Sequence, residues 1–384
     1  MSPRERILQE IREKGPIPFS RYMELCLYDP ELGYYSRNVE QFGKAGDFYT
    51  SSDVHAVFGR LLARQFEEMW RVLGSPEAIN IIELGPGRGL FARDVLDWSE
   101  KKFAQFFAAL HYSLVERSAV LKQRLRGTLE SAFSRGKTCI RDFPNNANDD
   151  IPVIIFANEF FDALPVAVLS SQGELRIAED GGRFNETWAP ASQEQLRFLD
   201  QYAVHPEEGE RIEAPLIAQK YMAQVAASVR RGFIVVIDYG YTRDELLAGR
   251  HRGTLMAYRQ HSASANPYEA PGEQDITAHV NFTALAAAAE QNGMQVWPLL
   301  TQSQLLLGIG EQNEFADAFE ECRLPQERAK VALQLKHLLT PAGLGETFHV
   351  LLASKGLDSE KVSTLSGLGF GRSRPESHDI GNVR

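Results

Sequence analysis

The chain has 384 residues, 43% of them hydrophobic, and a formal net charge of -10. This composition predicts a soluble globular protein with one large domain and additions, or with two domains. The acidic balance argues against nucleic-acid binding, which needs clustered basic residues, and favours a basic protein or peptide partner. The three cysteines lie far apart, so neither a disulfide framework nor a metal site is expected.

Residues 1–75 are predicted to form a helical segment that either caps the cofactor and faces the substrate or packs on a sheet edge. Ser2 and Glu5 form a predicted capping box at the first helix. Acidic residues in this helix argue against a mitochondrial presequence, and no apolar stretch approaches the roughly 18 residues of a membrane span. We therefore expect a cytoplasmic protein. An amphipathic helix is predicted from about Val54 to Trp70.

The stretch INIIELGPGRGL, from Ile79 to Leu90, predicts a strand, a tight turn and a helix, as in the first half of a Rossmann-like unit. Its glycines follow G-x-G-x-G, whereas dinucleotide binding uses G-x-G-x-x-G. Glu83 ends the strand, where a carboxylate repels a diphosphate but attracts the amino or sulfonium charge of S-adenosylmethionine. We therefore favour S-adenosylmethionine over NAD, although a turn without a ligand is the alternative. The assigned cofactor-site residues are Glu83, Gly85, Gly87 and Gly89.

The next two predicted strands also end in acids. Glu116 ends the second strand, where a Rossmann-like fold presents a carboxylate to ribose hydroxyls. It follows Gly89 by 27 residues, more than the roughly 20 of the dinucleotide pattern, so an extended helix is expected between them. Asp142 and Phe143 end the third strand, where they would either lie beside an adenine or form an ordinary loop.

The fourth predicted strand is apolar from Val153 to Ala157, as expected of a parallel strand covered on both faces. Asn158, Glu159 and Asp162 follow it directly. Because ligands bind beyond the carboxyl ends of such strands, this cluster is expected to face the cofactor pocket. Two carboxylates here favour a cationic substrate, while the alternative is that they only cap the following turn.

The rest of the chain is predicted to complete a methyltransferase-like domain over 76–355. Alternating residues around Gly181 and Gly182 predict a β-hairpin inside an insertion at about 166–212. A second insertion, at about 241–280, has little periodicity, which is typical of a binding loop. The last residues, 356–384, are predicted to form a flexible tail.

These motifs together resemble the MidA family, known in mitochondria as complex I assembly factor seven. The matching blocks, in order, are GPIPFSRYMELCLYDPELGYY, GDFYTS, ELGPGRG, NEFFDALP, IDYG and DITAHVNF. The resemblance covers nearly everything from Gly15 to about Lys355. It weakens after GDFYTS, at Ser52 to His55, and over 241–272.

The resemblance implies an α/β, Rossmann-like class I methyltransferase with a mostly parallel seven-stranded sheet, an N-terminal helical segment and a β-hairpin insertion. It implies S-adenosyl-L-methionine as cofactor, with Glu83, Gly85, Gly87 and Glu116 at its site. Thr50, in the GDFYTS block, is assigned to the cofactor side as well. The implied reaction is methylation of a protein arginine, with a core subunit of respiratory complex I as the implied partner.

For this reaction we assign Glu159 and Asp162 to hold the guanidinium, a planar cation suited to two carboxylates. Asn158 and His279 are weaker candidates for orientation or proton transfer, His279 being as well explained by a structural role. Three rival functions stay open: a methyltransferase-fold assembly factor without turnover, a small-molecule methyltransferase and, least favoured, an NAD-dependent oxidoreductase. The sequence leaves the oligomeric state open, a homodimer included.

Overall fold

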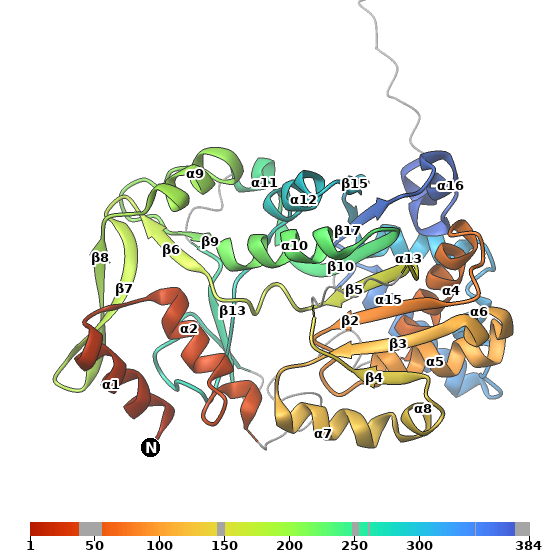
Figure 1. Ribbon diagram of the computed structural model, residues 1–384, viewed down its shortest axis with the longest axis horizontal. Coiled ribbons are helices and arrows are strands. Elements are labelled where there is room, and N and C mark those ends of the chain that lie inside the picture. Colours follow the sequence, from red (N-terminus) through yellow and green to blue (C-terminus); the bar gives the residue numbers. More distant parts are fainter. Residues whose placement is uncertain (38–55, 144–149, 248–252, 260–261, 342, 373–384) are drawn as a thin grey trace, which may run out of the picture.

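A mixed sheet of nine strands lies in the right-hand part of the molecule as drawn in Figure 1. The computed structural model describes residues 1–37, 56–143, 150–247, 253–259, 262–341 and 343–372. Within them the sheet order is β15-β17-β10-β5-β2-β3-β4, with β14 paired to β10 and β16 to β17. The strands are β2 (Ile79–Leu84), β3 (Leu110–Val115), β4 (Thr138–Ile140), β5 (Val153–Asn158), β10 (Gly232–Tyr241), β14 (Val280–Asn281), β15 (Gln295–Val296), β16 (Leu300–Thr301) and β17 (Phe348–Lys355).

This sheet confirms the α/β fold but is larger than the seven strands that we predicted. The five strands from β10 to β4 are parallel, and β17 pairs antiparallel with β10, β15 and β16. The short strands β15 and β16 are separated by Pro298, which lacks a backbone donor. The additional strand β14 has only two residues, too few to show a period in the sequence.

Helices cover both faces of the sheet, which explains its continuously apolar strands. Ile81 and Phe156 belong to a core shared with α4, α5 and α13, whereas Ile82 and Ala157 belong to a core shared with α10 and α12. The amphipathic helix expected before the glycine turn is α4, whose apolar residues from Val57 to Trp70 are buried, while Val54 lies outside the described residues. The helices around this sheet are α4 (Ala56–Val72), α5 (Leu90–Lys102), α6 (Ala104–Ala109), α7 (Ala119–Thr128), α8 (Glu130–Ser134), α10 (Leu216–Ser228), α12 (Phe282–Gln291), α13 (Gln302–Glu311), α14 (Ala316–Phe319) and α15 (Pro325–Leu339).

The predicted hairpin is part of a second, five-stranded antiparallel sheet. Its turn is Gly181–Gly182, and both glycines have a positive φ, as a two-residue hairpin turn requires. The sheet also takes in a strand from the N-terminal segment, which pairs with β7. Its strands are β1 (Ile17–Pro18), β6 (Ala167–Ser170), β7 (Gly173–Asp180), β8 (Arg183–Ala189) and β9 (Ile212–Ala214). The insertion is therefore a sheet, because distant segments add strands to the hairpin.

The N-terminal segment packs against this second sheet. Helices α1 (Pro3–Lys14) and α2 (Phe19–Tyr28) share a core with β6 and β7, and the capping box of Ser2 and Glu5 is present. The short helix η1 (Tyr34–Ser36) follows. In contrast α4, which we had grouped with this segment, packs on the main sheet beside α5. Helix α9 (Gln193–Tyr202) covers β6 and β9.

Two further segments differ from expectation. The insertion at 241–280 contains helix α11 (Arg243–Leu247) and a three-stranded antiparallel sheet of β11 (Met256–Arg259), β12 (Ser262–Ser264) and β13 (Asp275–Thr277). The flexible tail that we predicted begins with α16 (Ser359–Ser363) and η3 (Ser366–Arg372), in which Val362, Leu365 and Leu368 are buried. The prediction is therefore wrong for 359–372, where a few well-placed apolar residues are enough to dock the chain. Among the described residues no helix is long and apolar enough to span a membrane.

Candidate functional site

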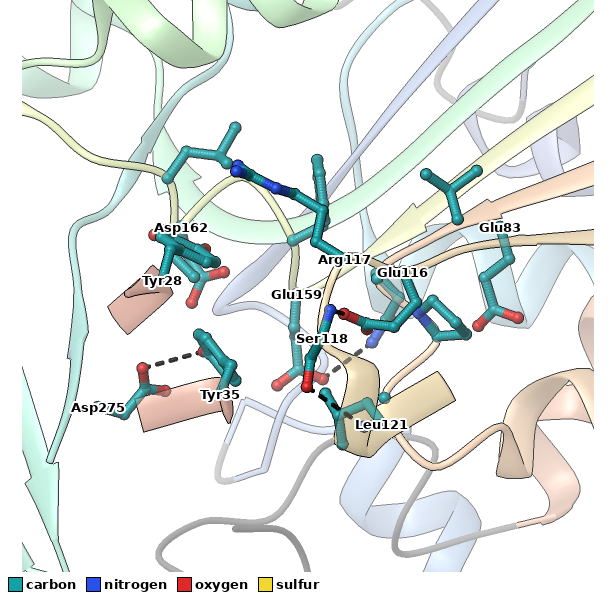
Figure 2. A pocket seen from close by; sticks show the side chains of 18 of the residues that line it. Tyr28, Tyr35, Glu83, Glu116, Arg117, Ser118, Leu121, Glu159, Asp162 and Asp275 are labelled. Carbon is teal, nitrogen blue, oxygen red and sulfur yellow. Dashed lines mark hydrogen bonds between the residues drawn. The ribbon is translucent and has the colours of Figure 1, made fainter. Parts of the chain in front are cut away.

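One cavity of about 920 Å³ lies beyond the carboxyl ends of β2, β3, β5 and β10, where open α/β sheets bind ligands (Figure 2). Residues of α2, η1 and β13 form its other walls. Ten of the predicted site residues line it: Glu83, Gly85, Gly87, Glu116, Asp142, Phe143, Asn158, Glu159, Asp162 and His279. Thr50 lies outside the described residues, and Gly89 is not among the lining residues.

The glycine turn joins β2 to α5 in a backbone conformation that other residues rarely adopt. Gly85, Gly87 and Gly89 have φ values of 64°, 53° and 77°. A Cβ at Gly85 would lie 2.8 Å from the ring of Phe160, and one at Gly89 would lie 2.7 Å from a methyl group of Leu125. Gly89 therefore serves helix packing, whereas Gly85 and Gly87 bring bare backbone to the cavity.

Glu83 is buried at the end of β2 and lines the cavity. Its Oε2 accepts a hydrogen bond of 3.0 Å from the hydroxyl of Tyr112. Burial raises the pKa of Glu83 to about 8, and the Tyr112 hydrogen bond opposes this rise. A cation bound beside Glu83 would favour the ionised carboxylate. The protonation state of Glu83 therefore depends on whether a cation is bound.

Glu116 follows β3 and is held by the start of the next helix. Its Oε1 accepts a hydrogen bond of 2.7 Å from the backbone N–H of Ser118, and burial raises the pKa of its carboxyl. Asp142 and Phe143 follow β4 and also line the cavity. These residues lie at neighbouring strand ends, where we predicted contacts to the ribose and the adenine of the cofactor.

The turn after β5 carries the predicted catalytic residues. Glu159 has a φ of 50°, which is rare for a residue with a side chain. Its Oε1 accepts a hydrogen bond of 3.0 Å from Asn158 Nδ2. The fully buried Asp238, on β10, holds the turn, because its Oδ2 accepts bonds from the backbone N–H groups of Phe160 (3.2 Å) and Phe161 (3.0 Å). Sequence reasoning missed Asp238, although IDYG was one of the matching blocks.

Asp162 is 5% exposed and faces the cavity from this turn. Its Oδ2 accepts a hydrogen bond of 2.5 Å from the Tyr239 hydroxyl. Burial raises the pKa of Asp162 to about 6, while the Tyr239 bond lowers it. Two buried acceptors at the cavity, Asp162 Oδ1 and Asn158 Oδ1, have no hydrogen-bond partner among the described residues. Such atoms call for a donor, and a bound ligand can supply one.

The wall opposite Glu83 is formed by residues that sequence reasoning did not assign. Figure 2 shows Tyr28, Tyr35 and Asp275 on the side of the cavity away from Glu83. Tyr35 donates a hydrogen bond of 3.0 Å to Asp275 Oδ1, and Tyr28 donates one of 3.0 Å to the carbonyl of Ala163. Tyr35 and Asp275 belong to the matching blocks GPIPFSRYMELCLYDPELGYY and DITAHVNF, but only folding shows that the two blocks meet.

His279 also lines the cavity, between β13 and β14, and its ring packs edge-on against Tyr239 at 5.3 Å between centroids. Its backbone N–H donates a hydrogen bond of 3.0 Å to Thr254 Oγ1. The structure therefore brings all four predicted catalytic residues to one cavity. His279 contacts the ring of Tyr239, whose hydroxyl in turn contacts Asp162.

Comparison with known proteins identifies the family. Residues 61–299 match the model of the S-adenosyl-L-methionine-dependent methyltransferase family Methyltransf_28. The chain belongs to this family. The matched residues include the glycine turn and the strand ends that line the cavity, so this methyltransferase carries its predicted site within the family region.

Several relatives of this methyltransferase have names or structures. The Drosophila melanogaster protein arginine methyltransferase NDUFAF7 homolog, mitochondrial, is 28% identical, over 95% of this chain and 88% of its own. The human protein arginine methyltransferase NDUFAF7, mitochondrial, is 26% identical, over 89% of this chain and 81% of its own. A COG1565 superfamily member from Burkholderia thailandensis, crystallised with S-adenosyl-homocysteine, superposes with a TM-score of 0.82 at 28% identity, covering 95% of this chain and 94% of that chain.

The cavity residues fit the cofactor of the family. Gly85 and Gly87 have no side chains that would keep a ligand from their backbone, and Glu83 offers a buried carboxylate to a cation. Glu116 lies one strand further along, at the position for a ribose. The ammonium group of S-adenosylmethionine suits the buried carboxylate of Glu83.

Proposed function

We propose that this methyltransferase modifies an arginine side chain of a protein. The observation that carries the proposal is the buried Oδ1 of Asp162, which no side chain of the described residues satisfies, at a cavity wall rich in acids and tyrosines. A guanidinium group is a planar cation with five N–H donors, so it can satisfy this oxygen and Asn158 Oδ1 together. The names of the relatives, protein arginine methyltransferases, support the same substrate class.

The charges along the cavity divide it into two parts. The ends of β2, β3 and β4 contribute both signs of charge, because three arginines accompany the three acids there: Arg88, Arg117 and Arg141 beside Glu83, Glu116 and Asp142. In contrast, the wall formed by α2, η1 and β13 contributes Glu24 and Asp275 together with Tyr28 and Tyr35. An arginine side chain would be attracted to this second part, because carboxylates and aromatic rings both bind guanidinium.

The chemistry at Asp162 follows from the charge balance of the reaction. When bound, S-adenosylmethionine supplies a methyl group whose bond to sulfur breaks with its electron pair left on sulfur, as the guanidino nitrogen bonds to carbon. The nitrogen carries a proton that must leave, because the methylated guanidinium keeps only one positive charge. We assign Asp162 Oδ1 to accept that proton. Glu159 and Asn158 would orient the guanidinium, and alignment of the reactants contributes roughly 7 to 11 kcal/mol.

Mass spectrometry tests this proposal. The purified protein would be incubated with S-adenosylmethionine and an extract of cells that lack its gene, and methylated residues would be located by peptide sequencing. The proposal requires new methyl groups on arginine. Methylation confined to small molecules, or cofactor binding with no methyl transfer to any component, would favour the rival functions instead.

The family resemblance extends the proposal to a core subunit of respiratory complex I as the target. Comparison of that complex from cells with and without the gene would reveal an arginine that loses its methyl groups. We also propose the cytoplasm as the location of this protein, which cell fractionation would test.

A further inference from the structure

The hydroxyl of Tyr239 makes the only side-chain hydrogen bond to Asp162 that the structure shows among its described residues. We propose that Tyr239 is a positioning residue for methyl transfer: it holds one carboxylate oxygen of Asp162 so that the other oxygen faces the substrate. This inference rests on the proposed arginine methylation. It assigns a role to a residue that sequence reasoning left out, and it gives a structural reason for the separate roles of Asp162 and Glu159.

Both partners of this hydrogen bond are fixed in place. The ring of Tyr239 packs edge-on against His279 and against Phe348, at 5.3 Å and 5.6 Å between centroids. The backbone of Asp162 donates to Asp238 Oδ2 at 3.4 Å, and its carbonyl accepts a bond of 2.9 Å from the Ala278 N–H. Rotation of the Asp162 side chain is therefore opposed at Oδ2, which leaves Oδ1 in its buried position at the cavity.

Glu159 is held differently. Its carboxylate accepts a bond from the side chain of the adjacent Asn158, and the residue is less buried than Asp162. A partly exposed carboxylate can bind and orient a cation, but it gains less from losing its charge than a buried one does. The two acids therefore have separate roles, with Glu159 in substrate binding and Asp162 in accepting the proton.

The Tyr239 hydroxyl also affects the pH at which Asp162 ionises. The charged and titratable groups around Asp162 are Asp238 on β10, Glu159 on the same turn, Asp275 on β13, and the side chains of Tyr28, Tyr35, Tyr258 and His279. None of these lowers the pKa of Asp162 by donating a side-chain hydrogen bond, as Tyr239 does. Removal of the hydroxyl should raise the pKa of Asp162, so the ionised form would require a higher pH.

The test is the substitution Tyr239→Phe, which removes the hydroxyl and keeps the ring. A charge-assisted hydrogen bond is worth about one to two pH units in the pKa of its acceptor. In the wild type, kcat for an arginine peptide should rise with pH as Asp162 ionises. In Tyr239→Phe the same rise should occur at a pH about one to two units higher. At pH 7 the variant should be about two- to tenfold slower than the wild type, and at pH 9 it should recover to within about threefold.

A binding measurement gives a readout without turnover. Calorimetry with the arginine peptide in the presence of S-adenosylhomocysteine should show that peptide affinity falls at low pH, and that the fall begins at higher pH in Tyr239→Phe. The matched control is Tyr202→Phe, which removes a hydroxyl outside the cavity, where it accepts a bond from Gln291. This control should keep both wild-type pH profiles.

Replacement of Tyr239 by 3,5-difluorotyrosine provides a second variant that keeps the hydrogen bond. Its more acidic hydroxyl should move the rise in kcat to lower pH, opposite to Tyr239→Phe. If the wild type is active and both variants show its pH dependence of kcat, the role of Tyr239 is overturned, while the proposed function is not. If the wild type neither methylates nor binds an arginine peptide, the proposed function is overturned, and this inference is overturned with it.

Discussion

Glu83 should make cofactor binding depend steeply on pH. Its pKa of about 8 means that only about one molecule in ten carries the ionised carboxylate at pH 7. A cationic cofactor binds the ionised form, so binding below pH 8 must first remove a proton. The dissociation constant for S-adenosylmethionine should therefore increase about tenfold for each pH unit below 8, or about 100-fold between pH 7.5 and 5.5.

The assay is isothermal titration calorimetry between pH 5.5 and 7.5, a range in which the α-amino group of the ligand, with a pKa of about 7.7 to 8.0, remains largely charged. Titrations at pH 7 in two buffers with different ionisation enthalpies should show the release of nearly one proton. Glu83→Gln should bind more weakly at pH 7.5 and lose the slope. Asp162→Asn should keep the slope, since Asp162 is assigned to the substrate. A flat wild-type curve, or a slope retained in Glu83→Gln, would refute the assignment of Glu83 to the cationic group.

The same pKa has a consequence for the protein without cofactor. A carboxyl whose pKa is raised from 4.5 to about 8 by folding contributes stability that is fully present below pH 4.5 and is lost as the pH rises through 8. The loss has an upper bound of about 5 kcal/mol, from 1.36 kcal/mol per pH unit. Thermal unfolding at pH 9 should therefore show Glu83→Gln to be more stable than the wild type, and equal stability would contradict the buried environment of Glu83.

Three further predictions concern the turn, the proton acceptor and the C-terminal segment. Gly87→Val should abolish cofactor binding in a calorimetric titration, because Gly87 has a φ of 53° and lines the cavity, whereas Gly87→Asn should keep a stable fold, since asparagine tolerates this conformation. Asp162→Asn should leave cofactor affinity unchanged while methyl transfer to arginine falls by about 10²- to 10⁴-fold, the usual contribution of a general base, and normal turnover would remove Asp162 from the mechanism. Deletion of residues 359–384 removes three buried apolar side chains and should lower the free energy of unfolding in denaturant titration by at least about 4 kcal/mol, whereas an unchanged midpoint would show that the docked segment adds no stability.

The cofactor half of the site could be predicted from the sequence because its residues are neighbours in the chain. Glu83, Gly85 and Gly87 lie within five residues, and strand, acid and glycine turn form one local pattern. The same holds for Asn158, Glu159 and Asp162, which follow directly from an apolar strand. Both groups of residues follow the end of a strand. This position is enough to bring them to the cavity, since parallel strands end at a common edge of the sheet.

The partners of these residues could not be predicted in the same way. Tyr239 is 77 residues from Asp162, and Tyr35 is 240 residues from Asp275, so no periodicity connects either pair. Likewise, Ile17 and Pro18 join the second sheet by pairing with β7, about 160 residues away. Such contacts depend on how whole elements pack, and the sequence pattern of one element carries little information about them.

The central claim is that an acidic cavity directs a methyl group to arginine, and a competition between two peptides tests it most directly. An arginine peptide and its lysine counterpart would be mixed in equal amounts with the protein and S-adenosylmethionine, and methylation of each would be followed by mass spectrometry. We expect methyl groups on the arginine peptide with wild-type protein and almost none with Asp162→Asn, at equal cofactor affinity. Equal methylation of both peptides, or of neither while the cofactor binds, would contradict the claim.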